Sequence, residues 1–189
     1  MESFFRTHRY LLEHLNAPVR RDLMDEIDWS CRLIGIKGTR GVGKTTFLLQ
    51  YAKEKFGYDR SCLYINMNNL YFQGRGIAEF AGDFQKMGGK VLLIDQVFKH
   101  PDWSEELRLC YDLYPNLKIV FTGSSVMRLK EENHSLNGIV KSYNLRGFSF
   151  FFFFFLIFEK SSPPGFCYLC KGVKFTPGRC VLPPYVLIF

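Results

Sequence analysis

The sequence lacks several features that would assign it to other classes of protein. Its longest apolar run, residues 150–158, is about half of the roughly 20 residues that a membrane-spanning helix needs. No block of five or more lysines and arginines appears, so we interpret the net charge of +7 as solvated helix faces. Cys167, Cys170 and Cys180 lack the fourth ligand of a structural zinc site. We therefore expect no membrane span, and the sequence does not support a nucleic-acid partner.

The start of the chain also lacks the charged-then-apolar pattern of a secretory leader, because Glu2, Arg6 and Arg9 follow Met1 closely. The length of 189 residues suits one α/β domain plus a smaller remnant. A chain of this length can bury a substantial core.

A glycine-rich segment is the most informative part of the sequence, because it fits the phosphate-binding pattern G-x-x-x-x-G-K-[ST]. Glycines let the backbone turn tightly, so that consecutive N–H groups point into one concavity that can hold a polyphosphate. In such a loop Lys44 reaches the β- and γ-phosphates, and the Thr45 hydroxyl ligates Mg²⁺. The predicted nucleotide-binding residues are Gly38, Thr39, Arg40, Gly41, Val42, Gly43, Lys44, Thr45 and Thr46.

The residues around this segment have the pattern that a phosphate-binding loop requires. Residues 32–36 form a short apolar run that predicts a buried strand entering the loop. Apolar side chains then recur at helical spacing from Phe47 to Phe56, and Gly57 suits a helix end. The positive end of that helix dipole would favour a phosphate. We expect a nucleotide binder of this kind in the cytoplasm, with its six cysteines as reduced thiols.

A second phosphate-handling element is predicted at Asp95, which ends the continuous apolar run of residues 91–94. In P-loop ATPases a carboxylate at the end of a buried strand holds the Mg²⁺ shell, although a helix or turn cap is the alternative here. The next residue is Gln96, whose amide can orient a water molecule but cannot take its proton. Loss of a general base slows a reaction by about 10²- to 10⁴-fold. Nucleotide binding should survive, because it depends on the loop, Lys44 and Mg²⁺.

Polar residues follow two other predicted strands. Residues 122–125 come directly after one strand, and Ser124 is a candidate for contact with the γ-phosphate or the attacking water. A simple turn with Ser and Thr hydrogen bonds is the alternative. Residues 66–69 follow another strand, where their side chains either line the same cleft or form an exposed turn.

Strands and helices alternate along residues 31–148, which predicts an α/β domain with a parallel, doubly wound sheet. Apolar residues recur at approximately helical spacing in residues 1–30, and Pro18 interrupts this pattern. Ligands bind such sheets at the carboxyl ends of the strands, where the loop, Asp95 and Ser124 all fall. We also expect Asp102 to cap the helix that follows it, with Glu105 as its capping-box partner. The further strands are expected at residues 62–66, 91–95, 117–121 and 139–143, and a helix at residues 77–87.

The amino-acid composition of the sequence changes after Gly147. Residues 150–155 are an unbroken phenylalanine run, and prolines follow with almost no helical or strand periodicity. The run is an aggregation hazard if it is exposed. We interpret residues 149–189 as a tail that is not a folded domain. A frameshifted or truncated reading frame, a hydrophobic surface anchor and a packed extension remain alternative explanations.

Five segments taken together resemble the prokaryotic AAA-type ATPases, usually called ATP-binding proteins, which carry a C-terminal domain of unknown function. These segments are residues 38–46, 91–95, 101–103, 111–112 and 121–125. The resemblance extends over roughly residues 5–150. It implies ATP and Mg²⁺ as ligands, with Lys44 and Thr45 on nucleotide and metal, Asp95 on the metal and Ser124 in the sensing position.

The chain departs from that family pattern in three places. The family usually has Asp-Glu where this chain has Asp95-Gln96, and an arginine where Ile139 follows Gly138. That arginine often acts from a neighbouring subunit. We also expect the C-terminal domain of the family to be missing or replaced in this sequence. The sequence therefore predicts ATP–Mg²⁺ binding with weak or absent hydrolysis, and a homo-oligomer or a protein partner is possible. The alternatives are a non-catalytic, nucleotide-dependent interaction module and a truncated or frameshifted fragment.

Overall fold

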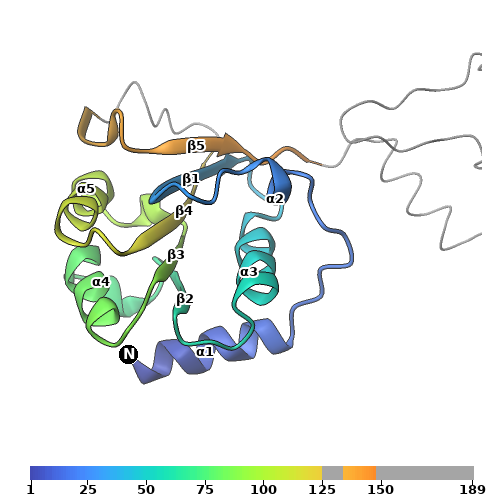
Figure 1. Cartoon of the computed structure of the whole chain (residues 1–189), viewed down its shortest axis with the longest axis horizontal. Coiled ribbons are helices and arrows are strands. Elements are labelled where there is room, and N and C mark those ends of the chain that lie inside the picture. Colours follow the sequence, from blue (N-terminus) through green and yellow to red (C-terminus); the bar gives the residue numbers. More distant parts are fainter. Residues whose placement is uncertain (125–133, 148–189) are drawn as a thin grey trace, which may run out of the picture. The chain divides into compact units, whose positions relative to one another are not determined.

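The computed structural model describes residues 1–124 and 134–147, which form a five-stranded sheet with helices on both faces (Figure 1). The strand order is β2-β3-β4-β1-β5, and all neighbouring strands are parallel. This arrangement confirms the predicted α/β class with a parallel, doubly wound sheet. The strands are β1 (Leu33–Gly38), β2 (Cys62–Asn66), β3 (Val91–Asp95), β4 (Lys118–Ser124) and β5 (Lys141–Asn144).

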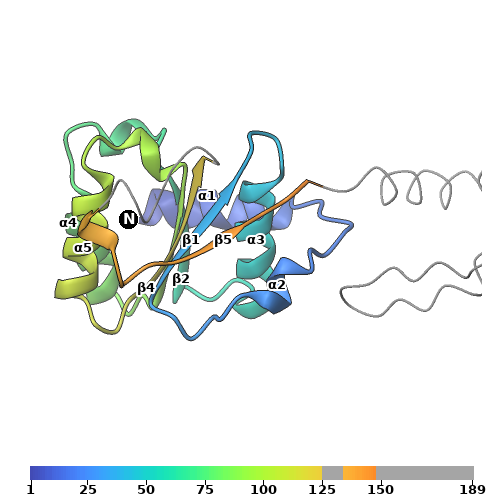
Figure 2. The ribbon, with the colours of Figure 1, turned by 90° about the horizontal axis from the view of Figure 1, so that it is seen from above.

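The helices form the outer layers of this α/β unit. Helix α3 packs on one face of the sheet, and α4 and α5 pack on the other (Figures 1 and 2). The lead-in expected over residues 1–30 is helical in two separate pieces, because Pro18 lies in the segment between α1 and α2. The helices are α1 (Glu2–Glu13), α2 (Leu23–Glu26), α3 (Lys44–Lys55), α4 (Ile77–Lys86) and α5 (Trp103–Leu113), with 3-10 turns η1 (Leu70–Phe72), η2 (Val97–Lys99) and η3 (His134–Leu136).

Strands β1 to β4 each contribute side chains to two separate hydrophobic cores, since successive side chains point to opposite faces of the sheet. In β3, Leu92 and Ile94 belong to the core under α4 and α5, whereas Val91 and Leu93 belong to the core under α3. Burial on both faces explains why this strand reads as a continuous apolar run in the sequence. Asp95 continues the second set and therefore faces the α3 side of the sheet.

Helix α1 lies along the open edge of the sheet and contacts both β2 and α3 (Figure 1). Its buried His8 accepts a hydrogen bond of 3.1 Å at Nδ1 from the backbone N–H of Tyr64 in β2. Phe4 and Phe5 enter one core, and Leu12 enters the other. The helix thereby covers a strand edge that would otherwise present unpaired backbone groups.

Three details of the predicted elements differ in the structure. The predicted capping box is wrong, since Asp102 precedes α5 but its side chain makes no capping hydrogen bond. Its φ of −101° and ψ of 32° depart from the extended conformation that orients a capping side chain. Strand β4 runs on to Ser124, because its pairing with β1 continues to Gly38. Strand β5 begins at Lys141, after a turn in which Gly138 has a φ of +80°.

The predicted tail, residues 149–189, lies outside the residues that the structure describes. In the part that is described, no helix has the length and apolar character needed to cross a membrane.

Candidate functional site

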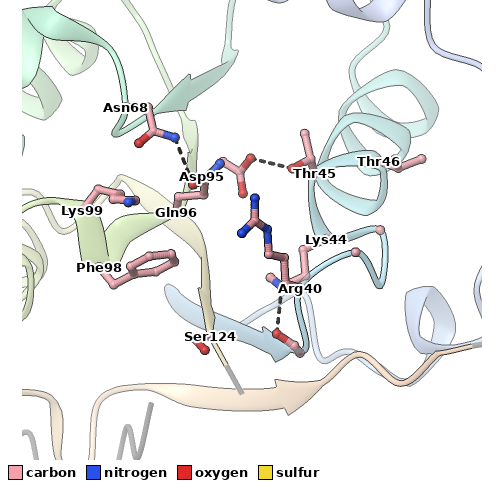
Figure 3. A pocket seen from close by; sticks show the side chains of 13 residues that line it. Arg40, Lys44, Thr45, Thr46, Asn68, Asp95, Gln96, Phe98, Lys99 and Ser124 are labelled. Carbon is pink, nitrogen blue, oxygen red and sulfur yellow. Dashed lines mark hydrogen bonds between the residues drawn. The ribbon is translucent and has the colours of Figure 1, made fainter. Parts of the chain in front are cut away.

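A cavity of about 750 Å³ lies at the carboxyl ends of β1, β3 and β4 (Figure 3). Such a volume is in the range of pockets that hold small molecules and cofactors. Strand β4 lies between β1 and β3, so Ser124 reaches the same edge as the loop and Asp95. The predicted residues that line the cavity are Gly38, Arg40, Gly41, Gly43, Lys44, Thr45, Thr46, Asp95, Gln96 and Ser124.

The loop between β1 and α3 has the backbone of a phosphate cradle. Gly41 and Gly43 have φ values of +83° and +94°, a region that side chains other than glycine rarely adopt. Gly43 occupies the position before α3 and supplies no side-chain cap, so the N–H groups of the first helical turn stay available to a ligand. Thr39 and Val42, also predicted in the loop, do not line the cavity.

Position 38 requires a glycine for a different reason, because the segment after β5 passes close to its backbone. A Cβ atom at this position would lie 2.7 Å from the carbonyl oxygen of Leu145 and 2.9 Å from Cγ1 of Val42. The N–H of Leu145 also donates a 2.7 Å hydrogen bond to the carbonyl of Lys37. The chain that leaves β5 is thereby held directly against the start of the loop.

The ammonium group of Lys44 is held at the mouth of the loop. Its Nζ donates to the carbonyl oxygens of Gly38 at 2.7 Å and Thr39 at 2.8 Å. Burial lowers the pKa of Lys44, and the negative charge of Asp95 opposes that shift. These two backbone acceptors fix the cation where a phosphate chain would pass over the loop.

Thr45 and Asp95 bring two hard oxygen ligands together. The Thr45 hydroxyl donates a 2.7 Å hydrogen bond to Oδ2 of Asp95, whose side chain is almost completely buried. The same carboxylate accepts from the Tyr64 hydroxyl at 2.9 Å and from the Thr122 hydroxyl at 2.5 Å. Burial and the Asp95 charge both raise the pKa of Tyr64, which keeps its phenol protonated as a donor. A hydroxyl and a carboxylate at this separation fit the oxygen ligation that Mg²⁺ prefers.

Gln96 follows Asp95 in an unusual backbone conformation. Its φ of 56° and ψ of 45° are left-handed, and it is the only non-glycine residue with positive φ in residues 1–124 and 134–147. Its backbone N–H donates to the Thr122 hydroxyl at 2.9 Å, and its side-chain oxygen accepts from Asn68 at 2.9 Å. The amide is therefore directed away from Asp95 toward the end of β2 (Figure 3).

Asn68, Phe98 and Lys99 complete the wall of the cavity opposite the loop. Residues 66–69 were expected either to line the cleft or to form an exposed turn. Asn68 is exposed and also lines the cavity, so both alternatives apply to it. Phe98 and Lys99 are exposed residues of η2 that the sequence analysis did not single out. No signal in the sequence distinguishes them from ordinary surface residues.

Sequence reasoning also missed Tyr64 as a partner of Asp95. Both residues lie in strands that the sequence predicts, but their contact depends on the register that pairs Asn66 with Asp95, which only the structure shows. The alternation of side chains then places Tyr64 and Asp95 on one face. The contact of Thr122 with Asp95 was missed as well, because the strand was expected to end at Phe121 and residues 122–125 were expected either to contact the γ-phosphate or the attacking water or to form a simple turn.

A parallel sheet, a glycine-rich loop between a strand and a helix, and a buried carboxylate at the end of β3, the second strand from β1 in the sheet, are the features of a P-loop nucleotide-binding domain. The chain belongs to the AAA domain family, whose profile matches residues 30–154. Membership of this family indicates nucleotide binding.

Among solved structures, the chain is similar to PCH-2 of C. elegans, with 18% sequence identity and a TM-score of 0.42. The match covers 76% of this chain and 41% of that one, so the chain spans less than half the length of PCH-2. A comparison with curated proteins finds no match.

Proposed function

We propose that this domain binds ATP together with Mg²⁺ in the cavity at the end of the sheet. The observation that carries the proposal is the 2.7 Å hydrogen bond between Thr45 and Asp95, which joins the start of α3 to the end of β3. Lys44 would bind the β- and γ-phosphates, and the first turn of α3 would supply backbone N–H groups. Thr45 and Asp95 would hold Mg²⁺, which neutralises phosphate charge when it is bound.

Hydrolysis should be weak in this proposal. Gln96 occupies the position of the general base, but an amide has no basic site that can accept a proton from water. The loss of such a base slows a reaction by about 10²- to 10⁴-fold. Binding would be unaffected, because Gln96 contacts Asn68 and Thr122 rather than Lys44 or Thr45. Ser124 remains a candidate for contact with the terminal phosphate.

The test is an equilibrium titration of the full-length chain with a fluorescent ATP analogue in the presence of Mg²⁺. The variant Lys44→Ala should lose nucleotide affinity, since it removes the ammonium group that the loop holds in place. The matched control is Lys53→Ala, an exposed lysine near the other end of α3. Equal affinity of Lys44→Ala and the wild-type chain would refute the assignment.

A second candidate function is a nucleotide-dependent interaction module that does not turn its ligand over. The pairing of Gln96 with Asn68 favours this function, because the side chain at the catalytic position is engaged in a neutral amide contact. Hydrogen exchange with ATP bound and without nucleotide would test it. A change in protection without measurable hydrolysis supports the module, whereas steady phosphate release supports an enzyme.

The remaining parts of the proposal rest mainly on the sequence. We place the chain near the prokaryotic AAA-type ATP-binding proteins, with a helical lead-in at residues 1–30 and the ATP-binding domain at residues 31–148. The proposal includes a homo-oligomer or a protein partner. Only a partner of different sequence would supply the arginine that is missing after Gly138, because a second copy of this chain has Ile139 there as well. A cytoplasmic location agrees with the free thiols of Cys31, Cys62 and Cys110. Translation of the neighbouring nucleotide sequence in all frames would show whether residues 149–189 replace the family's C-terminal domain.

A further inference from the structure

We propose that Arg40 contacts the terminal phosphate of the bound nucleotide and thereby selects ATP over ADP. This inference rests on the proposed nucleotide binding and adds a residue that distinguishes between two nucleotides. Three observations carry it: the position of Arg40 in the loop, the free hydrogen-bonding capacity of its guanidinium, and its direction in the cavity.

The position of Arg40 follows from the hydrogen bonds of Lys44. The Lys44 ammonium, which reaches the β- and γ-phosphates in such loops, lies against the carbonyls of Gly38 and Thr39. The first turn of α3 lies at the other end of the loop and takes the inner phosphates. The residue that follows Thr39 is therefore at the end of the cradle where the terminal phosphate would lie.

The side chain of Arg40 is exposed and lines the cavity. Figure 3 shows it extending from the loop toward Asp95, with its guanidinium in the space between the loop and the end of β3. Within residues 1–124 and 134–147 it has no ion-pair or hydrogen-bond partner. Asp95 accepts hydrogen bonds from Thr45, Tyr64 and Thr122 and forms no ion pair with Arg40.

The guanidinium of Arg40 is chemically suited to bind a phosphate. Its planar set of donors can bind two oxygens of one phosphate in a fixed bidentate geometry, whereas a lysine ammonium acts as a point charge. Lys99 lines the opposite wall of the same cavity, so the charge of the cavity alone does not single out Arg40. What distinguishes Arg40 is its attachment to the loop directly after Gly38 and Thr39, whose carbonyl oxygens hold the Lys44 ammonium.

The experiment compares ATP and ADP affinities of the full-length chain by equilibrium titration with Mg²⁺ present. Arg40→Ala should weaken ATP binding by about tenfold or more, the range expected for charge-assisted hydrogen bonds, and change ADP binding less than twofold. Arg40→Lys should recover part of the ATP affinity, since it keeps the charge without the planar fork. Lys99→Ala removes one positive charge from the same cavity and should leave the ratio of the two affinities unchanged.

Failure of this inference differs from failure of the proposed function. Equal losses for ATP and ADP in Arg40→Ala, or no loss for either, would overturn the role of Arg40. An equal change in the ratio of ATP affinity to ADP affinity in Lys99→Ala would also overturn the role of Arg40. The positive charge of the cavity as a whole would then explain the preference for ATP. Failure of the proposed function appears separately, as a Lys44→Ala variant that binds both nucleotides like the wild-type chain. A melting curve of each variant confirms that the fold is intact.

Discussion

The side-chain oxygen of Gln96 accepts a 2.9 Å hydrogen bond from the amide of Asn68, which lies just beyond the end of β2. Gln96 adopts a left-handed conformation, and its backbone N–H is fixed by Thr122. The residue at the expected catalytic position is thus held from two sides by neutral groups. This geometry fits a site that binds a nucleotide and hydrolyses it slowly.

Substitution of Gln96 by glutamate should raise the hydrolysis rate by at least about tenfold, because a carboxylate can take a proton from water. Phosphate release by the purified full-length chain measures this, with Gln73→Glu as a control that adds the same charge at an exposed position outside the cavity. A fast wild-type rate that glutamate does not improve would show that another residue activates the water. A slow rate that does not rise would instead indicate the missing arginine after Gly138.

Gly38→Ala should destabilise the fold, since its methyl group would overlap the carbonyl oxygen of Leu145 and a methyl group of Val42. Overpacking of this kind costs about 1–3 kcal/mol, which a chemical denaturation curve resolves. Gly147→Ala is the matched control, because a Cβ at that position meets no atom within 4 Å. An unchanged unfolding midpoint in Gly38→Ala would mean that the segment after β5 does not press against the loop.

The stability of the fold should depend on pH through His8. Burial lowers the pKa of His8 to about 4, below the value of about 6.5 of an unfolded histidine. Between these values the unfolded chain binds more protons, so the stabilisation is complete above pH 6.5 and is lost as the pH falls toward 4. The contribution is about 3 kcal/mol at most.

Denaturation curves at pH 7 and pH 4.5 test this for the wild-type chain and for His8→Asn. Asparagine keeps an acceptor for the Tyr64 N–H but does not titrate in this range. The wild-type chain should therefore lose more stability on acidification than the variant does. An equal loss in both proteins would show that His8 is not the group responsible.

Much of the site could be predicted from the sequence, because the pattern of the loop has strict local requirements. Gly41 and Gly43 adopt the positive φ values that only glycine tolerates well, and Lys44 begins a helix as expected. Asp95 could be identified as a candidate site residue because it directly follows a continuous apolar run, which is the pattern of a strand buried on both faces. These features depend on residues close together in the chain.

The rest depends on the order of the strands, which local patterns do not determine. The contact of Asp95 with Thr122 exists because β4 lies next to β3, and its contact with Tyr64 exists because β2 lies on the other side. The left-handed conformation of Gln96 had no signal either, since glutamine gives no preference for it. The expected Asp102 cap failed because a residue suited to a cap does not by itself set the backbone geometry.

The central claim, that Thr45 and Asp95 hold Mg²⁺ beside a bound ATP, is tested most directly by titrating ATP in Mg²⁺ and in EDTA. Mg²⁺ should tighten ATP binding to the wild-type chain by about tenfold or more, and Thr45→Val should lose most of this gain. Thr7→Val, an exposed threonine of α1, should retain the full gain. Identical ATP affinities in Mg²⁺ and EDTA for the wild-type chain, or an undiminished gain in Thr45→Val, would contradict the account.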